Sequence, residues 1–270
     1  MKKLTALLLC AAALLALCAC GENENTLFAA ASPETSALEL QWFDGAKGES
    51  RLLFDQAAEK EILAALGKVR AKKTEDWLPE KVTYPVYGLW IGTKEGEGVQ
   101  AAWCDGYLLL RDGSVYKFDY DFAALTEKYK WETMREISSA AELYCGRFLA
   151  EGGGRWYPIH MTPATLKAAP EGISLKLTAA GPESLTAELT NASGESWCFG
   201  KYFSLQVRLY DEWYEVPPTP EHNWGFEDIG LILAPGQTRE ETYPLMMYGD
   251  LPKGVYRLVI EGLTAEFELD

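Results

Sequence analysis

Residues 173–191 read ISLKLTAAGPESLTAELTN, and this stretch carries the clearest structural signal in the chain. Apolar and polar residues alternate over residues 173–177 and again over residues 185–191. Successive side chains of a β-strand point to opposite faces, so alternation with a period of two is typical of a strand with one buried face. The stretch therefore predicts two strands, each with one face in a core.

The same kind of pattern continues to the end of the chain. Further short strands are expected at residues 203–210, 213–216, 229–233, 238–243 and 255–260. Turn signals stand between some of them, at Pro235-Gly236 and at Pro252-Lys-Gly254. About seven short strands at regular spacing are typical of a β-sandwich. The sequence therefore predicts an all-β sandwich at residues 157–270.

A series of motifs in this region resembles a known family. In order they are Leu189-Thr-Asn191, Gly200-Lys-Tyr-Phe203, Trp213-Tyr-Glu-Val-Pro217, Asp228-Ile-Gly-Leu-Ile-Leu-Ala-Pro-Gly236 and Tyr248-Gly-Asp-Leu-Pro-Lys-Gly-Val-Tyr-Arg257. Together they resemble the bacterial immunoglobulin-like domain of surface proteins of Gram-positive bacteria. The resemblance implies an immunoglobulin-like sandwich and an extracellular setting, and it supplies no catalytic residues. Tyr256 fits the tyrosine corner of such sandwiches, with an ordinary core tyrosine as the alternative.

Residues 37–151 show a mixed pattern, which predicts an α+β domain made of an antiparallel sheet with packed helices. Asp-Gly pairs between apolar runs, at Asp105-Gly106 and Asp112-Gly113, predict tight hairpins. Strands are expected at residues 38–43, 51–54, 82–91, 99–104, 107–110 and 114–118, and helices at residues 55–73, 122–131 and 137–149.

Basic residues and a glycine run stand out in and after the first domain. The cations Lys68, Arg70, Lys72 and Lys73 would stand in the last turns of the helix at residues 55–73, where the helix dipole favours positive charge. The run Glu151-Gly-Gly-Gly154 interrupts the pattern, and we expect the boundary between the two domains there.

The first twenty residues, MKKLTALLLCAAALLALCAC, have the form of a secretory signal. Leu17-Cys18-Ala19-Cys20 resembles the lipobox of bacterial lipoproteins. The resemblance implies that residues 1–19 are removed and that Cys20 carries a lipid, which would hold the protein on the extracytoplasmic face of the membrane. The alternative is an uncleaved membrane helix, for which the apolar run is slightly short. Residues 20–36 are small and polar and predict a flexible tether.

Charge excludes one class of partner. The 270 residues carry a net charge of −15, and such an acidic chain does not suit nucleic acid, whose phosphates attract lysine and arginine. Hydrophobic residues make up 48% of the chain and include nine tryptophans, which is enough for packed cores.

The cysteines and histidines point to neither a metal nor a cofactor. Cys104 and Cys145 are the one pair considered for a disulfide, with two buried free thiols as the favoured alternative. Cys198, between two aromatic residues, is expected to be a small core residue. His160 and His222 are expected in exposed loops, and no spacing typical of a metal site occurs.

The sequence contains no complete catalytic motif. The match to SxxK at Ser114-Val-Tyr-Lys117 alternates like a strand and lacks the partner motifs of serine acyltransferases. The aromatic residues Trp213, Tyr214, Trp224 and Phe226 flank the loop at residues 217–223. They either pack within the sandwich or form a platform for a partner.

These observations favour a lipid-anchored, non-enzymatic surface protein that binds or regulates another component of the cell envelope. The partner would be a protein, a peptide or a glycan. The alternative is an envelope enzyme or enzyme inhibitor with its site in the first domain, and a third reading is a structural spacer.

Overall fold

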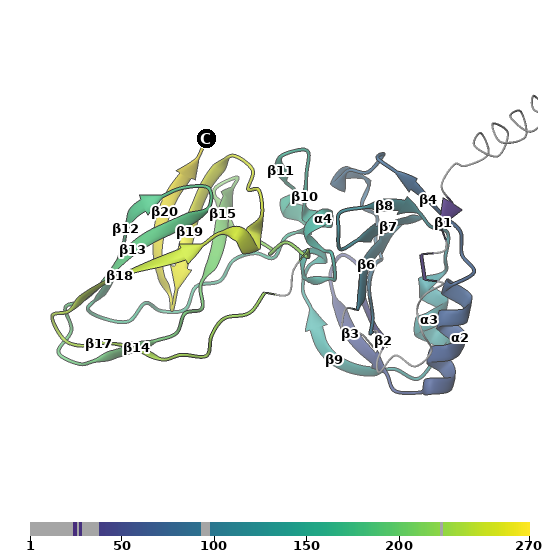
Figure 1. Cartoon of the computed structure of the whole chain (residues 1–270), viewed down its shortest axis with the longest axis horizontal. Helices are drawn as coiled ribbons and strands as arrows, with labels where there is room; N and C mark the ends of the chain where they lie inside the picture. The colour runs from purple at the N-terminus through teal and green to yellow at the C-terminus, as the bar shows by residue number, and fades with distance from the viewer. Residues whose placement is uncertain (1–23, 26, 29–37, 93–97, 222–223) are drawn as a thin grey trace, which may run out of the picture.

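The computed structural model describes residues 24–25, 27–28, 38–92, 98–221 and 224–270, which are mostly β and form two lobes (Figure 1). The leader at residues 1–19 and the lipidation residue expected at position 20 lie outside the described residues. Within the described ranges, no helix is long and apolar enough to cross a membrane.

The first lobe is built on one nine-stranded antiparallel sheet, in the order β1-β4-β8-β7-β6-β5-β2-β3-β9. Its strands are β1 (Glu24–Asn25), β2 (Leu38–Phe43), β3 (Gly48–Leu53), β4 (Ala71–Thr74), β5 (Val86–Ile91), β6 (Val99–Cys104), β7 (Tyr107–Leu110), β8 (Val115–Lys117) and β9 (Glu132–Ile137). The hairpin expected at Asp105-Gly106 joins β6 to β7, and both of its residues have positive φ, of 44° and 81°.

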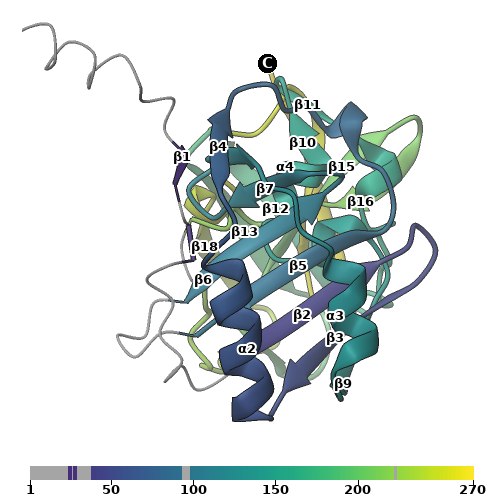
Figure 2. The same cartoon turned by 90° about the vertical axis from the view of Figure 1, so that its right-hand side faces the viewer.

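Two helices cover one face of this sheet (Figure 2). They are α2 (Gln56–Leu66) and α3 (Phe122–Lys128). Asp55 caps α2, because its carboxylate accepts hydrogen bonds from the backbone of Ala57 and Ala58. Leu40, Leu89, Ile62 and Phe122 are among the buried side chains that join the sheet to these helices.

The opposite face is covered by the segment that follows β9. This segment contains the 3-10 helix η2 (Ala140–Glu142) and the short helix α4 (Arg147–Ala150). Leu143 and Leu149 pack there on Val86, Ala102 and Leu109 of the sheet. The segment therefore lies between the sheet and the second lobe (Figure 1).

Two expected helices were partly wrong. The helix expected at residues 55–73 ends at Leu66, and Lys72 and Lys73 lie in β4, because pairing with β8 near the sheet edge outweighs helix propensity. The helix expected at residues 137–149 is broken, because Cys145 has a φ of 56° and its neighbours form only short turns. Its apolar residues pack on the sheet without a helical period.

The tether expected at residues 20–36 is not free of the first lobe along its whole length. Phe28 is 1% exposed and packs edge-on against Phe118, with ring centroids 5.6 Å apart. β1 also pairs with β4. Part of the segment therefore belongs to the first lobe, since burying a phenylalanine stabilises this docking.

The second lobe is a sandwich of antiparallel strands. One sheet has the order β16-β15-β19-β20, a second has the order β12-β13-β18, and a two-stranded ribbon, β14-β17, extends from them (Figure 1). The strands are β12 (Ile173–Ala180), β13 (Ser184–Asn191), β14 (Trp197–Phe199), β15 (Ser204–Leu209), β16 (Glu212–Glu215), β17 (Leu231–Leu233), β18 (Thr238–Pro244), β19 (Gly254–Ile260) and β20 (Leu263–Leu269).

Short elements join and complete the lobes. A small hairpin pairs β10 (Glu151–Gly152) with β11 (Arg155–Trp156), and the remaining 3-10 helices are η1 (Pro79–Lys81), η3 (Pro158–His160) and η4 (Met246–Tyr248). Tyr256 is fully buried, and its hydroxyl donates to the Pro252 carbonyl and accepts a hydrogen bond from the Trp156 indole at 2.9 Å. This is the bonding of a tyrosine corner.

The second core begins before residue 157, where the sandwich was expected to start. Trp156 and Ala150 are buried in the same cluster as Tyr256 and Leu258. The triglycine run lies on the β10–β11 hairpin, so these residues form a turn at the junction of the two lobes.

Candidate functional site

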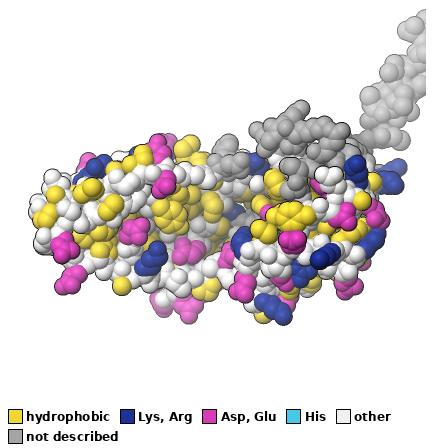
Figure 3. All heavy atoms as spheres, turned by 90° about the horizontal axis from the view of Figure 1, so that it is seen from below, with side chains coloured by type: hydrophobic (Ala, Val, Ile, Leu, Met, Phe, Trp, Pro, Cys, Tyr) yellow, Lys and Arg dark blue, Asp and Glu magenta, His cyan; other side chains and the backbone are white. Residues whose placement is uncertain are grey.

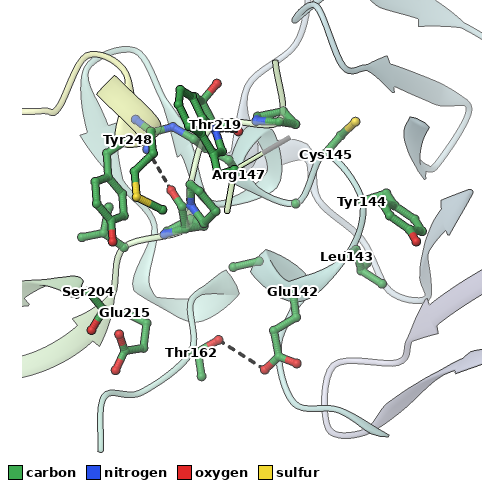
Figure 4. Close-up of a pocket in the computed structure, with 18 of the residues that line it drawn as sticks. Glu142, Leu143, Tyr144, Cys145, Arg147, Thr162, Ser204, Glu215, Thr219 and Tyr248 are labelled. Atoms are coloured by element: carbon green, nitrogen blue, oxygen red, sulfur yellow. Dashed lines mark hydrogen bonds between the residues drawn. The ribbon is translucent and has the colours of Figure 1, made fainter. Parts of the chain in front are cut away.

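A cavity of about 880 Å³ lies where the two lobes meet, and we call it the junction cavity (Figure 4). Residues 141–147 line it from the first lobe, and residues 215–220 with Tyr248 line it from the second. Because both lobes supply walls, the shape of this cavity depends on how firmly the lobes are held together.

Arginines of the first lobe hold the proline-rich loop of the second. Arg147 is 5% exposed and donates to the Pro217 carbonyl at 3.0 Å and to the Asp250 carbonyl at 2.8 Å. Its guanidinium also lies over the Trp156 ring, 4.8 Å from the centroid. Arg111 donates to the Pro220 carbonyl at 2.6 Å. One wall of the junction cavity is thus fixed by charge-assisted bonds to backbone oxygens.

Two carboxylates face the junction cavity, one from each lobe, with Thr162 between them (Figure 4). The Thr162 hydroxyl donates to Glu142 Oε1 at 3.4 Å, and the Thr162 carbonyl accepts from the Glu215 backbone at 2.9 Å. Gln206 donates to Glu215 Oε1 at 2.6 Å. Burial raises the pKa of the Glu215 carboxyl, with the Gln206 hydrogen bond opposing the shift.

Trp224 and Phe226 lie at a second cavity of about 430 Å³, which we call the aromatic cavity. Trp224 also lines the junction cavity, and its indole donates to the Thr219 carbonyl at 3.0 Å. Phe226 packs edge-on against Tyr202 and Phe203, with centroids 5.1 and 5.4 Å away. Trp224 therefore stands between the two cavities, whereas Phe226 lines the aromatic cavity alone and is 36% exposed.

Trp213 and Tyr214, the other two aromatic residues singled out from the sequence, are not brought to either cavity. Both lie on β16, where the Arg257 guanidinium sits 4.1 Å from the Trp213 ring centroid. The Tyr214 hydroxyl donates to Glu212 at 2.9 Å. The four aromatic residues are thus split between two places in the second lobe.

The three described cysteines are free thiols. Cys104 and Cys145 are buried in one apolar cluster, in agreement with the alternative that both are buried free thiols. Cys145 lines the junction cavity, and burial raises its thiol pKa to about 12, so the thiol is protonated at neutral pH and is a poor nucleophile. Cys198 is exposed, not a core residue, because it points outward from β14 beside Ile232 of β17.

His160 was wrongly expected to be exposed, whereas His222 lies outside the described residues. His160 is 5% exposed and bonds the Tyr84 hydroxyl at 2.7 Å. Its Nε2 donates to the Pro79 carbonyl at 3.3 Å, since a carbonyl can only accept. Burial lowers the pKa of this imidazole. In the described ranges no group of three side chains could hold a metal ion.

Sequence reasoning missed Arg147, Glu142 and Glu215. Glu215 stands within the motif Trp213-Tyr-Glu-Val-Pro217, but alternation alone does not distinguish a cavity face from an open one. Arg147 is an ordinary cation in sequence, and only its burial against carbonyl oxygens marks it. Acidic side chains are spread over both lobes on the face seen in Figure 3, so charge pattern did not single out these two.

Comparison with known proteins assigns the second lobe. A family model described as a bacterial Ig-like domain matches residues 169–268. A search of curated proteins found no match, and a search of solved structures found none either. The match agrees with the sandwich, the tyrosine corner and the resemblance in the sequence. Residues 169–268 of this chain form a bacterial immunoglobulin-like domain.

Proposed function

We propose that this chain is a lipid-anchored protein of the extracytoplasmic face of a membrane that binds another component of the cell envelope in the junction cavity. The lipobox-like run ending at Cys20 supports the anchor. The immunoglobulin-like domain at residues 169–268 supports the extracellular setting, because the sequence motifs in this region resemble those of surface proteins of Gram-positive bacteria.

The observation that carries the binding function is the junction cavity itself. It combines apolar walls with a few convergent polar groups, which is the usual make-up of a binding site. Its walls come from both lobes and are held by Arg147 and Arg111, so the shape exists before a partner arrives. A preformed site loses less entropy on binding.

The chemistry of the lining favours binding over catalysis. The cavity's cysteine is protonated at neutral pH, and none of its described lining residues is a histidine. Glu142 has its carboxylate oxygens occupied by Thr162 and Arg135. A nucleophile activated by a neighbouring base, as acyl transfer requires, is therefore not assembled among the described lining residues.

Site-specific photo-crosslinking tests this proposal. A benzophenone amino acid is placed at Tyr202, which is 59% exposed on the cavity rim, or at Met134, which is 56% exposed on β9 of the first lobe. Irradiation of intact cells should give a covalent adduct with an envelope component from position 202 and none from position 134. Equal adducts from both positions, or none from position 202, would refute the proposal.

A further inference from the structure

The junction cavity adjoins two cavities of the second lobe. The junction and aromatic cavities share Phe203, Trp224 and Met247. A third cavity of about 190 Å³, which we call the strand-edge cavity, shares Tyr202, Ser204 and Glu215 with the junction cavity. We call these three adjoining cavities together the groove; the junction cavity shares walls with each of the other two, so a ligand that reaches more than one of them must be extended.

The aromatic end of the groove is suited to an apolar side chain. Phe199, Phe203, Phe226 and Met246 line it, and Met246 is 66% exposed. Methionine is flexible and polarisable, so it can adapt to an apolar group of variable shape. The 430 Å³ of this cavity are enough for one large side chain.

The centre of the groove is suited to a positive charge. Glu215 is partly buried, and among the described residues its carboxylate forms no direct salt bridge; it accepts a hydrogen bond from Gln206, and the charge of Arg257, which donates to the same Gln206 at 2.7 Å, acts on it from farther away. Its raised pKa shows that the surroundings compensate its negative charge incompletely. Glu142 adds a second carboxylate across Thr162. A cation placed here gains chiefly from Glu215, because Glu142 already pairs with Arg135 at 3.3 Å.

We propose that this groove binds an extended peptide segment of a partner protein, with a basic side chain at Glu215 and Glu142 and a large apolar side chain in the aromatic cavity. The inference rests on the proposed function and names its ligand class. A chain carrying a net charge of −15 attracts a basic segment over a distance. A glycan fits less well, because the charged side chains that line the aromatic cavity are already paired, Lys201 with Glu227 and Glu241 with Arg239, and phenylalanine and methionine side chains supply much of the rest.

Synthetic peptides test the ligand class on the full-length protein in detergent. Each fluorescent peptide has about nine residues, an extended length of about 30 Å, with one Lys and one Phe at varied separations on a Gly/Ser background. Matched peptides carry Glu for Lys or Ser for Phe, and chitotetraose serves as the glycan probe. Fluorescence anisotropy should show that the peptide binds at one favoured separation of Lys and Phe. Replacing Lys with Glu in that peptide should weaken its affinity about tenfold or more.

Variants of the protein then locate the bound peptide. Glu215→Gln should weaken the affinity for the peptide with Lys and Phe about tenfold and leave the affinity for the peptide with Glu in place of Lys unchanged. Glu268→Gln is the matched control, because Glu268 is exposed on β20 outside the three cavities and loses the same charge. Met246→Ala should weaken the affinity for the peptide with Phe and leave the affinity for the peptide with Ser in place of Phe unchanged.

The outcomes separate this inference from the proposed function. No peptide binding, or chitotetraose binding in place of peptide, overturns the peptide inference, while a cross-link from Tyr202 would still support the proposed function. Equal losses from Glu215→Gln and Glu268→Gln also overturn it, because the effect would then be general charge. Localised peptide binding without any cellular adduct would support the groove and refute the proposed function.

Discussion

Replacing Arg147 with alanine should destabilise the whole chain, because this side chain is a buried link between the two lobes. The change removes two hydrogen bonds from a guanidinium to the carbonyls of Pro217 and Asp250, at 3.0 and 2.8 Å. It leaves both oxygens without that donor and removes the contact with the Trp156 ring. Disrupting a buried charged group of this kind costs about 3–5 kcal/mol.

The assay is urea unfolding of the full chain, with Arg155→Ala as the matched control. Arg155 lies on the neighbouring hairpin, its side chain is 64% exposed, and it pairs with Glu80 at the surface. An exposed pair contributes about 1 kcal/mol or less. The loss of unfolding free energy in Arg147→Lys should lie between those of Arg147→Ala and Arg155→Ala, because one ammonium group cannot span both carbonyls as the guanidinium does.

One result would refute the reasoning. If Arg147→Ala lowers the free energy of unfolding by no more than Arg155→Ala does, the bonds between the lobes contribute little. The proline-rich loop would then be held by other contacts, and the preformed shape of the junction cavity would lose its physical basis.

Further expectations concern the anchor, the docked segment, the corner tyrosine and the buried histidine. Cys20→Ala should abolish incorporation of radioactive fatty acid by cells, and a wild type that incorporates none would refute lipidation. Phe28→Ala should lower the free energy of unfolding by about 3–5 kcal/mol in urea, because it empties a buried aromatic site. Tyr256→Phe should cost about 1–3 kcal/mol in the same assay, because the Trp156 indole loses its acceptor. Burial lowers the pKa of His160 in the folded chain, so the unfolded chain takes up this proton at a higher pH than the folded chain does. The contribution of the neutral, buried imidazole to the free energy of unfolding is therefore complete above about pH 6.5. It is lost as the pH falls through the lowered pKa of the folded chain. Urea unfolding between about pH 5 and pH 8 should show this loss relative to His160→Gln, and identical pH profiles would contradict it.

Elements with strong local signals could be predicted from the sequence. Alternation over residues 185–191 predicted β13, which spans Ser184–Asn191, and Asp55 marked the start of α2. The prediction of secondary structure failed where pairing with a strand distant in sequence determines it. Lys72 and Lys73 have helical neighbours in sequence, yet β1 and β8 supply pairing on both sides of β4. No local pattern contains that information.

The candidate site was predicted in part for the same reason. Trp224 and Phe226 stood out by residue type, and both line cavities. Glu215 acquires its character from burial, and Arg147 from burial and from a partner in the other lobe, the Pro217 carbonyl, 70 residues away. Trp156 was assigned to the boundary, although its indole completes the hydrogen bonding of the sandwich core.

The central claim is that a partner occupies the junction cavity and contacts its half-buried carboxylate. The most direct measurement is the yield of the Tyr202 photo-adduct in intact cells, compared among the unchanged protein, Glu215→Gln and Glu268→Gln. We expect the yield to be reduced several-fold by Glu215→Gln and unchanged by Glu268→Gln, at equal amounts of folded protein. The same yield in all three would contradict the claim, because the partner would then bind without using the carboxylate at the centre of the groove.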